Sequence, residues 1–537
     1  MKNILDVKNL KIGIKSKFNT ELLVKNVSFN LEKGDILGVV GESGSGKTLT
    51  CKSIIKLFDN TDLYCEGEVI YQGKNLLQAN KNHLNMIRGE EISMIFQNPS
   101  THLDPLMRIG HQISETLTVR QKLNKKDSYI KVIELLKSVN IKNPEEKYHC
   151  FPHEFSGGMK QRVMIAAALA CNPKILIADE PTTALDVTVQ SLFLKLLKEI
   201  NEKFKISIIF VSHDLGVIAN TCNKIVVMKK GNVMDFGTKN EIINHPKNDY
   251  TKELISSYPQ LEEIHHKYNS KNKKIVFQVK NLNMVWKKFN LFKFFKNKSS
   301  DISVGLNDLE LNVFKGDRIG VVGESGSGKS TLAKILIKIL NPSSGSIIFD
   351  GLDLKKLDKK NEMKMRQAVQ MIFQDPYSSL NPKKTVEYLL AEPLIFHNIV
   401  SEQNVLTKVD ELMSKVGLEN NLKNKFPHQL SGGQCQRVNI ARALSVSPNV
   451  LIADEPTSAL DVTIQSQIID LILDLSNQLN LTLIFISHDL SIVRKVCDRI
   501  IVMKNGRIVE EGQTEQIFKD PNTEYTRELI SSIPTIN

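Results

Sequence analysis

The chain has few cysteines for its length, seven in 537 residues, and no two of them form a C-x-x-C pair. They are Cys51, Cys65, Cys150, Cys171, Cys222, Cys435 and Cys497. An odd and scattered set matches neither metal-ligand spacing nor a disulfide framework. We therefore expect reduced thiols with mainly structural roles.

Long hydrophobic runs are also missing, although hydrophobic residues make up 41% of the chain. No apolar run approaches the roughly 18 residues that a membrane-spanning helix requires. Residues 1–6 lack the apolar core of a signal peptide. These absences predict a cytoplasmic chain with large buried cores.

Acidic residues are in the minority, 59 against 71 lysines and arginines, which gives a net charge of +12. Such an excess allows attraction to nucleic acid or to an anionic membrane. We favour a lysine-rich, solvated surface. The single tryptophan, Trp286, opens a basic and aromatic stretch, 286–298, that the first half of the chain lacks. That stretch could touch a membrane surface, but a surface hairpin or loop is the favoured interpretation.

One octet of the form G-x-x-x-x-G-K-[ST] is present twice. The first copy consists of Gly41, Glu42, Ser43, Gly44, Ser45, Gly46, Lys47 and Thr48. The second consists of Gly323, Glu324, Ser325, Gly326, Ser327, Gly328, Lys329 and Ser330. Each copy follows a short apolar run that predicts a buried strand and precedes a helical pattern, which is the context of a phosphate-binding loop. Backbone N–H groups and the helix N-terminus would bind phosphates, the lysine would reach the terminal phosphates, and Thr48 or Ser330 would bind Mg²⁺.

The order of the patterns predicts two similar α/β domains. Alternating apolar and polar positions before each octet indicate antiparallel strands. Residues 100–150 are helical in pattern, and apolar strands then alternate with helices, which is typical of a parallel sheet. We place the first domain at 1–260, a polar linker at 261–274 and the second domain at 275–537.

In each half an apolar strand ends in two successive acids, Asp179 with Glu180 and Asp454 with Glu455. Two carboxylates at the end of a buried strand would be costly without a cationic partner. The end of such a strand lies beside the phosphate loop, so the first acid can hold Mg²⁺ and the second can polarise a water molecule.

Three further elements recur in the same order in both halves. A Ser-Gly-Gly motif opens a helix, either as an anion-binding nest or as a simple helix cap. A histidine follows an apolar strand, where it could contact a γ-phosphate or serve a structural role. A glutamine precedes a proline-containing loop. These residues are Ser156, Gly157, Gly158, Ser431, Gly432, Gly433, His213, His488, Gln97 and Gln374.

Taken together, the motifs resemble those of ATP-binding cassette (ABC) ATPases with two fused nucleotide-binding domains. The resemblance covers essentially the whole chain. It implies tandem P-loop NTPase domains, each with a RecA-like core, an antiparallel β subdomain and a helical subdomain, that bind ATP and Mg²⁺. It also implies roles for individual residues. The Walker A loops would be 41–48 and 323–330, Walker B would end at Asp179 and Asp454, and the catalytic bases would be Glu180 and Glu455. The Q-loop residues would be Gln97 and Gln374, which also contact Mg²⁺, the signatures would begin at Ser156 and Ser431, and the switch histidines would be His213 and His488.

In this family the two domains pair head to tail, so ATP at Lys47 would be capped by Ser431 and ATP at Lys329 by Ser156. All the catalytic residues are present in both halves, and we expect both sites to hydrolyse ATP. Met159 stands where the first signature usually has glutamine. The adenine-stacking residue stays open between Ile14 and Phe18 in the first half, and between Trp286 and Phe289 in the second.

The stretches after Gln97 and Gln374, and the tails with Tyr250-Thr251 and Tyr525-Thr526, are similar to the oligopeptide, dipeptide and nickel importer group. That similarity implies two transmembrane permease subunits, a solute-binding protein, no nucleic acid, and peripheral association with the cytoplasmic face of the inner (plasma) membrane. The solute stays open among peptide, glutathione, nickel and others. The alternative is a soluble tandem-cassette ATPase acting on ribosomes or nucleic acid, which the short linker and the absence of zinc-type cysteines disfavour.

Overall fold

The computed structural model describes residues 3–15, 20–58, 62–97, 99–182, 185–258, 273–287, 302–458, 460–534 and 536. The chain divides into two compact units, residues 1–258 with 534–537, and residues 259–533. Most of the predicted linker, 261–272, lies outside the described residues. Within the described part, no helix is both long enough and apolar enough to cross a membrane.

The first unit begins with an antiparallel layer. β1 (Asn3–Lys15) pairs with β2 (Thr20–Glu32) on one side and with β4 (Leu63–Tyr71) on the other, and β5 (Lys74–Asn75) closes the edge. Buried and exposed residues alternate along much of β1 and β2, as expected for a sheet with one buried face. This layer is the predicted antiparallel β subdomain.

A mostly parallel sheet forms the centre of the first unit, in the order β10-β9-β3-β8-β7-β6. Its strands are β3 (Ile36–Val40), β6 (Ile92–Ile95), β7 (Ile175–Asp179), β8 (Ser207–Ser212), β9 (Lys224–Lys229) and β10 (Asn232–Thr238). Only the β9–β10 pair within it is antiparallel. Every residue of β3, β7 and β8 is buried, which is typical of strands covered on both faces.

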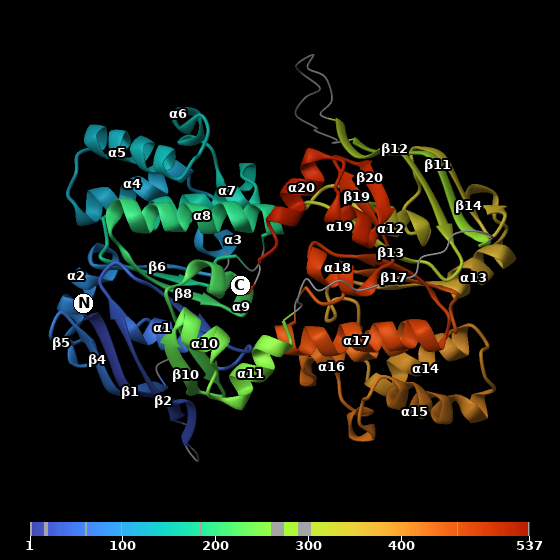
Figure 1. Ribbon diagram of the computed structural model, residues 1–537, viewed down its shortest axis with the longest axis horizontal. Helices are drawn as coiled ribbons and strands as arrows, with labels where there is room; N and C mark the ends of the chain where they lie inside the picture. The colour runs from blue at the N-terminus through green and yellow to red at the C-terminus, as the bar shows by residue number, and fades with distance from the viewer. Residues whose placement is uncertain are drawn as a thin grey trace. The chain divides into compact units, whose positions relative to one another are not determined.

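Helices surround this sheet (Figure 1). A helical subdomain is formed by α4 (Ile109–Arg120), α5 (Lys125–Ser138), α6 (Pro144–Lys147) and α7 (Gly157–Leu169). The remaining helices are α1 (Lys47–Ile54), α2 (Lys81–Glu90), α3 (Pro99–His102), α8 (Val187–Phe204), α9 (Leu215–Thr221), α10 (Lys239–Asn244) and α11 (Asp249–Ser256). Several begin where a side chain accepts a hydrogen bond from the first turn, as Asn124, Asp186 and Asp214 do.

The second unit repeats this architecture. Its antiparallel sheet contains β11 (Ile275–Lys287), β12 (Ile302–Phe314), β14 (Ser344–Phe349) and β15 (Leu352–Asp353). Its central sheet has the order β16-β17-β18-β13-β19-β20, with strands β13 (Arg318–Val322), β16 (Val369–Ile372), β17 (Val450–Asp454), β18 (Thr482–Ile486), β19 (Arg499–Lys504) and β20 (Arg507–Gln513). Its helices are α12 (Lys329–Leu336), α13 (Lys359–Ala368), α14 (Val386–Phe396), α15 (Val405–Lys415), α16 (Gly432–Leu444), α17 (Val462–Gln478), α18 (Leu490–Val496), α19 (Thr514–Lys519) and α20 (Glu524–Ser531). The predicted fold class is confirmed in both units.

The basic and aromatic stretch 286–298 begins at the end of β11. Trp286 is part of that strand, with 42% of its side chain exposed, and it packs beside Gly305 of β12. Residues 288–298, including Phe289, lie outside the described residues, as does Phe18 of the first half. All seven cysteines are free thiols.

Gly38 in β3 and Gly320 in β13 each let a helix pack closely against the strand that leads into a phosphate loop. A Cβ at Gly38 of β3 would lie 2.5 Å from Ile218 Cγ2 of α9, and one at Gly320 of β13 would lie 2.3 Å from Val493 Cγ1 of α18. Helices α9 and α18 begin two residues after His213 and His488, so this packing joins the strand before each loop to the helix after each histidine.

We expect Gly38→Ala to lower the free energy of unfolding by about 1–3 kcal/mol, because the added methyl overpacks a filled core. Denaturant unfolding of the full chain measures the loss. The double variant with Ile218→Ala, which removes the atom that clashes, should lose less than the sum of the two single variants. Additive losses would contradict this packing argument.

Candidate functional site

Each phosphate loop is shaped by glycines that no other residue could replace without strain. Gly41 has φ 155°, and a Cβ there would lie 2.1 Å from the Met228 carbonyl oxygen. Gly46, with φ 97°, leads directly into α1 at Lys47. Gly323 and Gly328 repeat these conformations before α12. The loops therefore present backbone N–H groups at a helix N-terminus, as anion binding requires.

The loop lysines are buried, at 4% exposed for Lys47 and 5% for Lys329. Lys47 Nζ donates to the carbonyl oxygens of Gly41 and Glu42 at 2.7 and 2.8 Å. Lys329 makes the matching bonds to Gly323 and Glu324. These bonds hold the ammonium group inside the loop, where a bound phosphate would meet it.

A hydroxyl and a strand-end carboxylate meet beside each loop. Thr48 Oγ1 donates to Asp179 Oδ1 at 3.0 Å, and Ser330 Oγ donates to Asp454 Oδ1 at 3.0 Å. Burial raises the pKa of Asp179 and of Asp454, with the neighbouring glutamate adding to the shift and the hydroxyl bond opposing it. Two adjacent oxygen ligands of octahedral Mg²⁺ lie about 3 Å apart. The oxygens present therefore fit a divalent cation, which would also relieve the buried charge.

The following glutamate is the centre of a second cluster. Glu180 Oε2 accepts a bond from Gln97 Nε2 at 2.9 Å and lies 3.5 Å from His213 Nδ1, while Glu180 Oε1 is 3.8 Å from Lys47 Nζ. In the second unit, Gln374 Nε2 donates to Glu455 Oε2 at 2.8 Å, and His488 Nδ1 is 3.3 Å away. Residues from three other segments thus converge on the Glu180 carboxylate, and residues from two other segments on that of Glu455.

Both glutamates adopt left-handed backbone, with φ 43° at Glu180 and 45° at Glu455. A non-glycine residue pays on the order of 1 kcal/mol or more for this conformation, and such strain gathers at functional sites. The turn aims each carboxylate away from its strand and toward the glutamine and histidine.

In the second unit, opposing effects set the pKa values of His488 and Glu455. Burial disfavours the charged form of His488, but its hydrogen bond to Glu455 and the charge of that carboxylate raise the pKa of His488 overall. Burial also works against ionised Glu455, yet the bond and charge of His488 together with Lys329 lower its pKa. The pKa of His213 is raised in the same way beside Glu180.

The signature serines are held by their own helices. Ser156 accepts a bond from Met159 N and caps α7, and Ser431 accepts one from Gln434 N and caps α16. In the second unit Gln434 Oε1 also accepts from Ser431 N, closing a capping box that Met159 cannot form. Gly158 and Gly433 allow close packing on Val189 and Ile464, where an added Cβ would lie at 2.6 Å.

One contact of the second loop was not predicted. Glu324 N donates to the hydroxyl of Tyr525 on α20 at 3.0 Å. The helix is anchored by Glu510 of β20, which accepts bonds from Asn522 N and Thr523 N. The recurrence of a Tyr-Thr pair after each cassette was the available signal, but its contact with the loop depends on tertiary packing.

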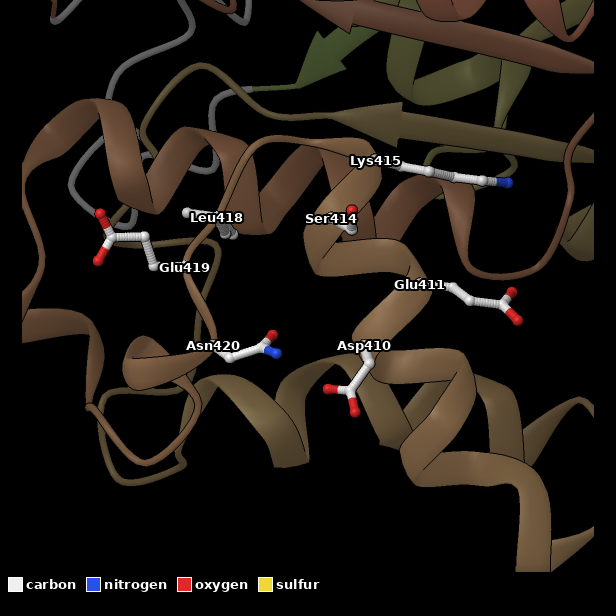
Figure 2. Close-up of a pocket in the computed structure, with 7 residues that line it drawn as sticks. All are labelled: Asp410, Glu411, Ser414, Lys415, Leu418, Glu419 and Asn420. Atoms are coloured by element: carbon white, nitrogen blue, oxygen red, sulfur yellow. The ribbon is translucent and has the colours of Figure 1, made fainter.

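A surface depression in the second unit is separate from these clusters. It lies on α15 and the segment that follows (Figure 2), and its lining residues are Asp410, Glu411, Ser414, Lys415, Leu418, Glu419 and Asn420. Asp410 pairs with Lys423, and Glu411 pairs with Lys408. It is a solvated, charge-paired face of the helical subdomain.

The two sites together define a P-loop nucleotide hydrolase with two ATP-binding units in one chain. The ABC transporter family matches residues 24–183 and again 306–458, and the chain belongs to that family. The C-terminal region of oligopeptide/dipeptide transporters matches residues 234–282 and 509–537. The predicted resemblance and the predicted ATP hydrolase activity are both confirmed.

Curated relatives match along nearly the whole chain. The peptidoglycan transport ATP-binding protein YejF of Agrobacterium fabrum is 38% identical over 531 residues, covering 98% of this chain and 96% of the relative. The glutathione import ATP-binding protein GsiA of Escherichia coli K12 is 35% identical over 561 residues, covering 99% and 90%. A solved dimeric ATP-binding cassette in a post-hydrolysis state with ADP and Pi is 31% identical, covers 44% of this chain and 98% of its own, and has a TM-score of 0.40.

The pair formed by His488 and Glu455 predicts a pH-dependent stability. The contribution of the histidine is complete below its unfolded pKa of about 6.5 and is lost as the pH rises through its raised folded pKa. The contribution of the glutamate is complete above about 4.3 and is lost as the pH falls through its lowered folded pKa. We expect His488→Gln to lower the melting temperature by about 1–2 °C near pH 6 and by almost nothing near pH 9.

Differential scanning calorimetry of the full chain at both pH values measures this effect. Glu455→Gln should show the same trend, because it removes the other partner. His428→Gln, at a histidine stacked on Phe426, serves as the control and should show no such trend. An equal loss of melting temperature at both pH values would show that the His488–Glu455 interaction does not stabilise the folded chain.

Proposed function

We propose that this chain is the ATP-hydrolysing subunit of an importer for peptides or similar small solutes. The observation that carries the ATPase part is the duplicated convergence of glutamine and histidine on Glu180 and on Glu455, with Lys47 3.8 Å from Glu180 and the charge of Lys329 lowering the pKa of Glu455. The import part is supported by the C-terminal region shared with oligopeptide/dipeptide transporters and by relatives named for glutathione import and peptidoglycan transport.

In the proposed chemistry, Glu180 and Glu455 orient the attacking water and accept its proton. Each carboxylate accepts a hydrogen bond from a glutamine amide on Oε2 and lies beside a histidine, so a water molecule bound next to it would have a carboxylate as its proton acceptor. Lys47 and Lys329, with the loop N–H groups, stabilise the negative charge that develops on the phosphoryl oxygens. The histidines fix the glutamate position and face the same space.

Mg²⁺ would be held by Thr48 and Asp179 in the first unit and by Ser330 and Asp454 in the second, with Gln97 and Gln374 as further ligands. When bound, the ion neutralises charge on the β- and γ-phosphates. The buried aspartates supply the fixed negative charge that such an ion requires.

The proposed assembly adds chains that this sequence does not contain. In it the two cassettes, 1–260 and 275–537, pair head to tail, with Ser431 capping ATP at Lys47 and Ser156 capping ATP at Lys329. Two permease subunits receive the motion, a solute-binding protein delivers the solute, and the chain is peripheral to the inner membrane. Action on ribosomes or nucleic acid is disfavoured by the near full-length match to import and transport ATPases.

The glutamates give a direct test of the chemistry. We expect the double variant Glu180→Gln/Glu455→Gln to lose about 10²–10⁴-fold in kcat for ATP hydrolysis while retaining ATP binding, because the amide cannot accept the proton of water. Phosphate release and fluorescent-nucleotide titration measure the two effects.

The matched control neutralises two exposed acids on helices α8 and α17, Glu199→Gln/Asp474→Asn, and should hydrolyse ATP at the normal rate. Retention of more than a tenth of the wild-type kcat by the glutamate double variant would refute the assigned role.

A second test addresses the import role. Affinity capture of the tagged full chain from detergent-solubilised membranes should recover two multi-span permeases in near-stoichiometric amounts, because an ABC importer works as one assembly. Mass spectrometry identifies the partners, and an untagged strain is the control. Recovery of ribosomal proteins or nucleic-acid enzymes, with no membrane protein, would overturn the import role and leave the ATPase assignment intact.

A further inference from the structure

In the second unit, the segment that follows Gln374 is hydrogen-bonded to the signature helix α16. Asn439 of that helix is buried, with 6% of its surface exposed. Its Nδ2 donates to the Pro376 carbonyl oxygen at 3.1 Å, and its Oδ1 accepts from Ser379 Oγ at 2.9 Å. One buried amide therefore uses both ends to hold the segment.

Two more bonds reinforce this connection. Arg442 Nη1, also on α16, donates to the Ser379 carbonyl oxygen at 3.1 Å. The Tyr377 hydroxyl donates to the Leu430 carbonyl oxygen at 3.1 Å, and Leu430 is the residue before the signature Ser431. The bonds thus reach both the start of the signature helix and its middle.

The first unit has different residues at the matching positions. Met164 and Ala167 stand where α16 has Asn439 and Arg442, so α7 offers no side-chain donor at either place. His102 stands where the second unit has Ser379, and its ring stacks on Phe96 at 4.3 Å between centroids and 4° between planes. The first segment thus has a ring contact next to Gln97, and α7 has neither an amide nor a guanidinium group at the two matching positions.

We propose that residues 376–379 and the signature helix α16 act as one hydrogen-bonded unit, with Asn439 as its main positioning residue, and that Met164 and Ala167 of the first cassette cannot reproduce the bonds of Asn439 and Arg442. A displacement beside Gln374 then carries Ser431 with it, whereas a displacement beside Gln97 does not reach Ser156 by the same bonds. This inference rests on the proposed roles of Gln374 and Ser431 in ATP hydrolysis.

The physical reason is the cost of breaking a buried bond. Moving the segment away from α16 would leave the Asn439 amide and the Pro376 carbonyl oxygen, which share a buried bond, without partners. A buried polar group without a partner costs more than its hydrogen bond contributes. The segment and the helix consequently shift together. Met164 has no hydrogen-bonding group to lose at the matching position of the first cassette.

The test uses the full chain and two variants. Asn439→Leu keeps the branched side-chain shape and removes both bonds, and Tyr377→Phe removes only a hydroxyl from a half-exposed ring, so folding of the latter is secure. Hydrogen–deuterium exchange reports the amides of 377–381 and 431–437, and ATPase assays report kcat and KM. Met164→Leu in α7 is the matched control.

We expect amide exchange in both segments to rise about 10-fold in Asn439→Leu and about 3-fold in Tyr377→Phe, with no change in Met164→Leu. We expect kcat to fall about 5-fold in Asn439→Leu, with KM for ATP changed less than 2-fold, because the phosphate loops are untouched.

Unchanged exchange in both variants would overturn the proposal, and so would faster exchange with a normal kcat. Failure of the ATPase assignment has a different signature, no ATP hydrolysis by the unaltered chain. The exchange data therefore distinguish an error about the hydrogen-bonded unit of residues 376–379 and α16 from an error about the proposed function.

Discussion

Each half of the chain depends on a lysine that must stay charged although it is almost fully buried. An ammonium group removed from water costs several kcal/mol unless it is surrounded by fixed partners. Two loop carbonyl oxygens bond Lys47 and a glutamate lies nearby, and Lys329 has the same carbonyl bonds. The rest of the architecture supplies these partners. Glycines bend the loop around the lysine, parallel strands end beside it, and the strained turn after Asp179 or Asp454 brings the carboxylate into place.

The sequence was informative where chemistry and local structure coincide. The phosphate loops, the strand-end acids and the strand–helix alternation identified the fold class because buried strands and glycine loops leave strong local patterns. The convergence of Gln97, Glu180 and His213 could be expected only through the family resemblance, since these residues come from separate strands. The contact of Tyr525 with Glu324, and the bonds from Asn439 to the segment after Gln374, left no periodic signal because they arise from tertiary packing.

The two halves are equal in their reacting groups and unequal in what holds those groups. Both have the lysine, aspartate, glutamate, glutamine and histidine in nearly superimposable arrangements of hydrogen bonds. The signature helix of the second unit, however, has a closed capping box at Ser431 and polar bonds from Asn439 and Arg442, whereas α7 begins with Met159 and carries Met164 and Ala167. Duplication has thus preserved the chemistry and allowed the supporting contacts to diverge.

The bond between Tyr525 and the second phosphate loop has a practical consequence for handling the protein. Helix α20 spans residues 524–531, close to the end of the chain, and it reaches the nucleotide site through one hydroxyl. A truncation that ends before Tyr525 would therefore remove a hydroxyl that touches the loop at 323–330. Any shortened form of the chain that keeps α20 whole retains the group that makes this contact, and biochemical measurements on the second site depend on that choice.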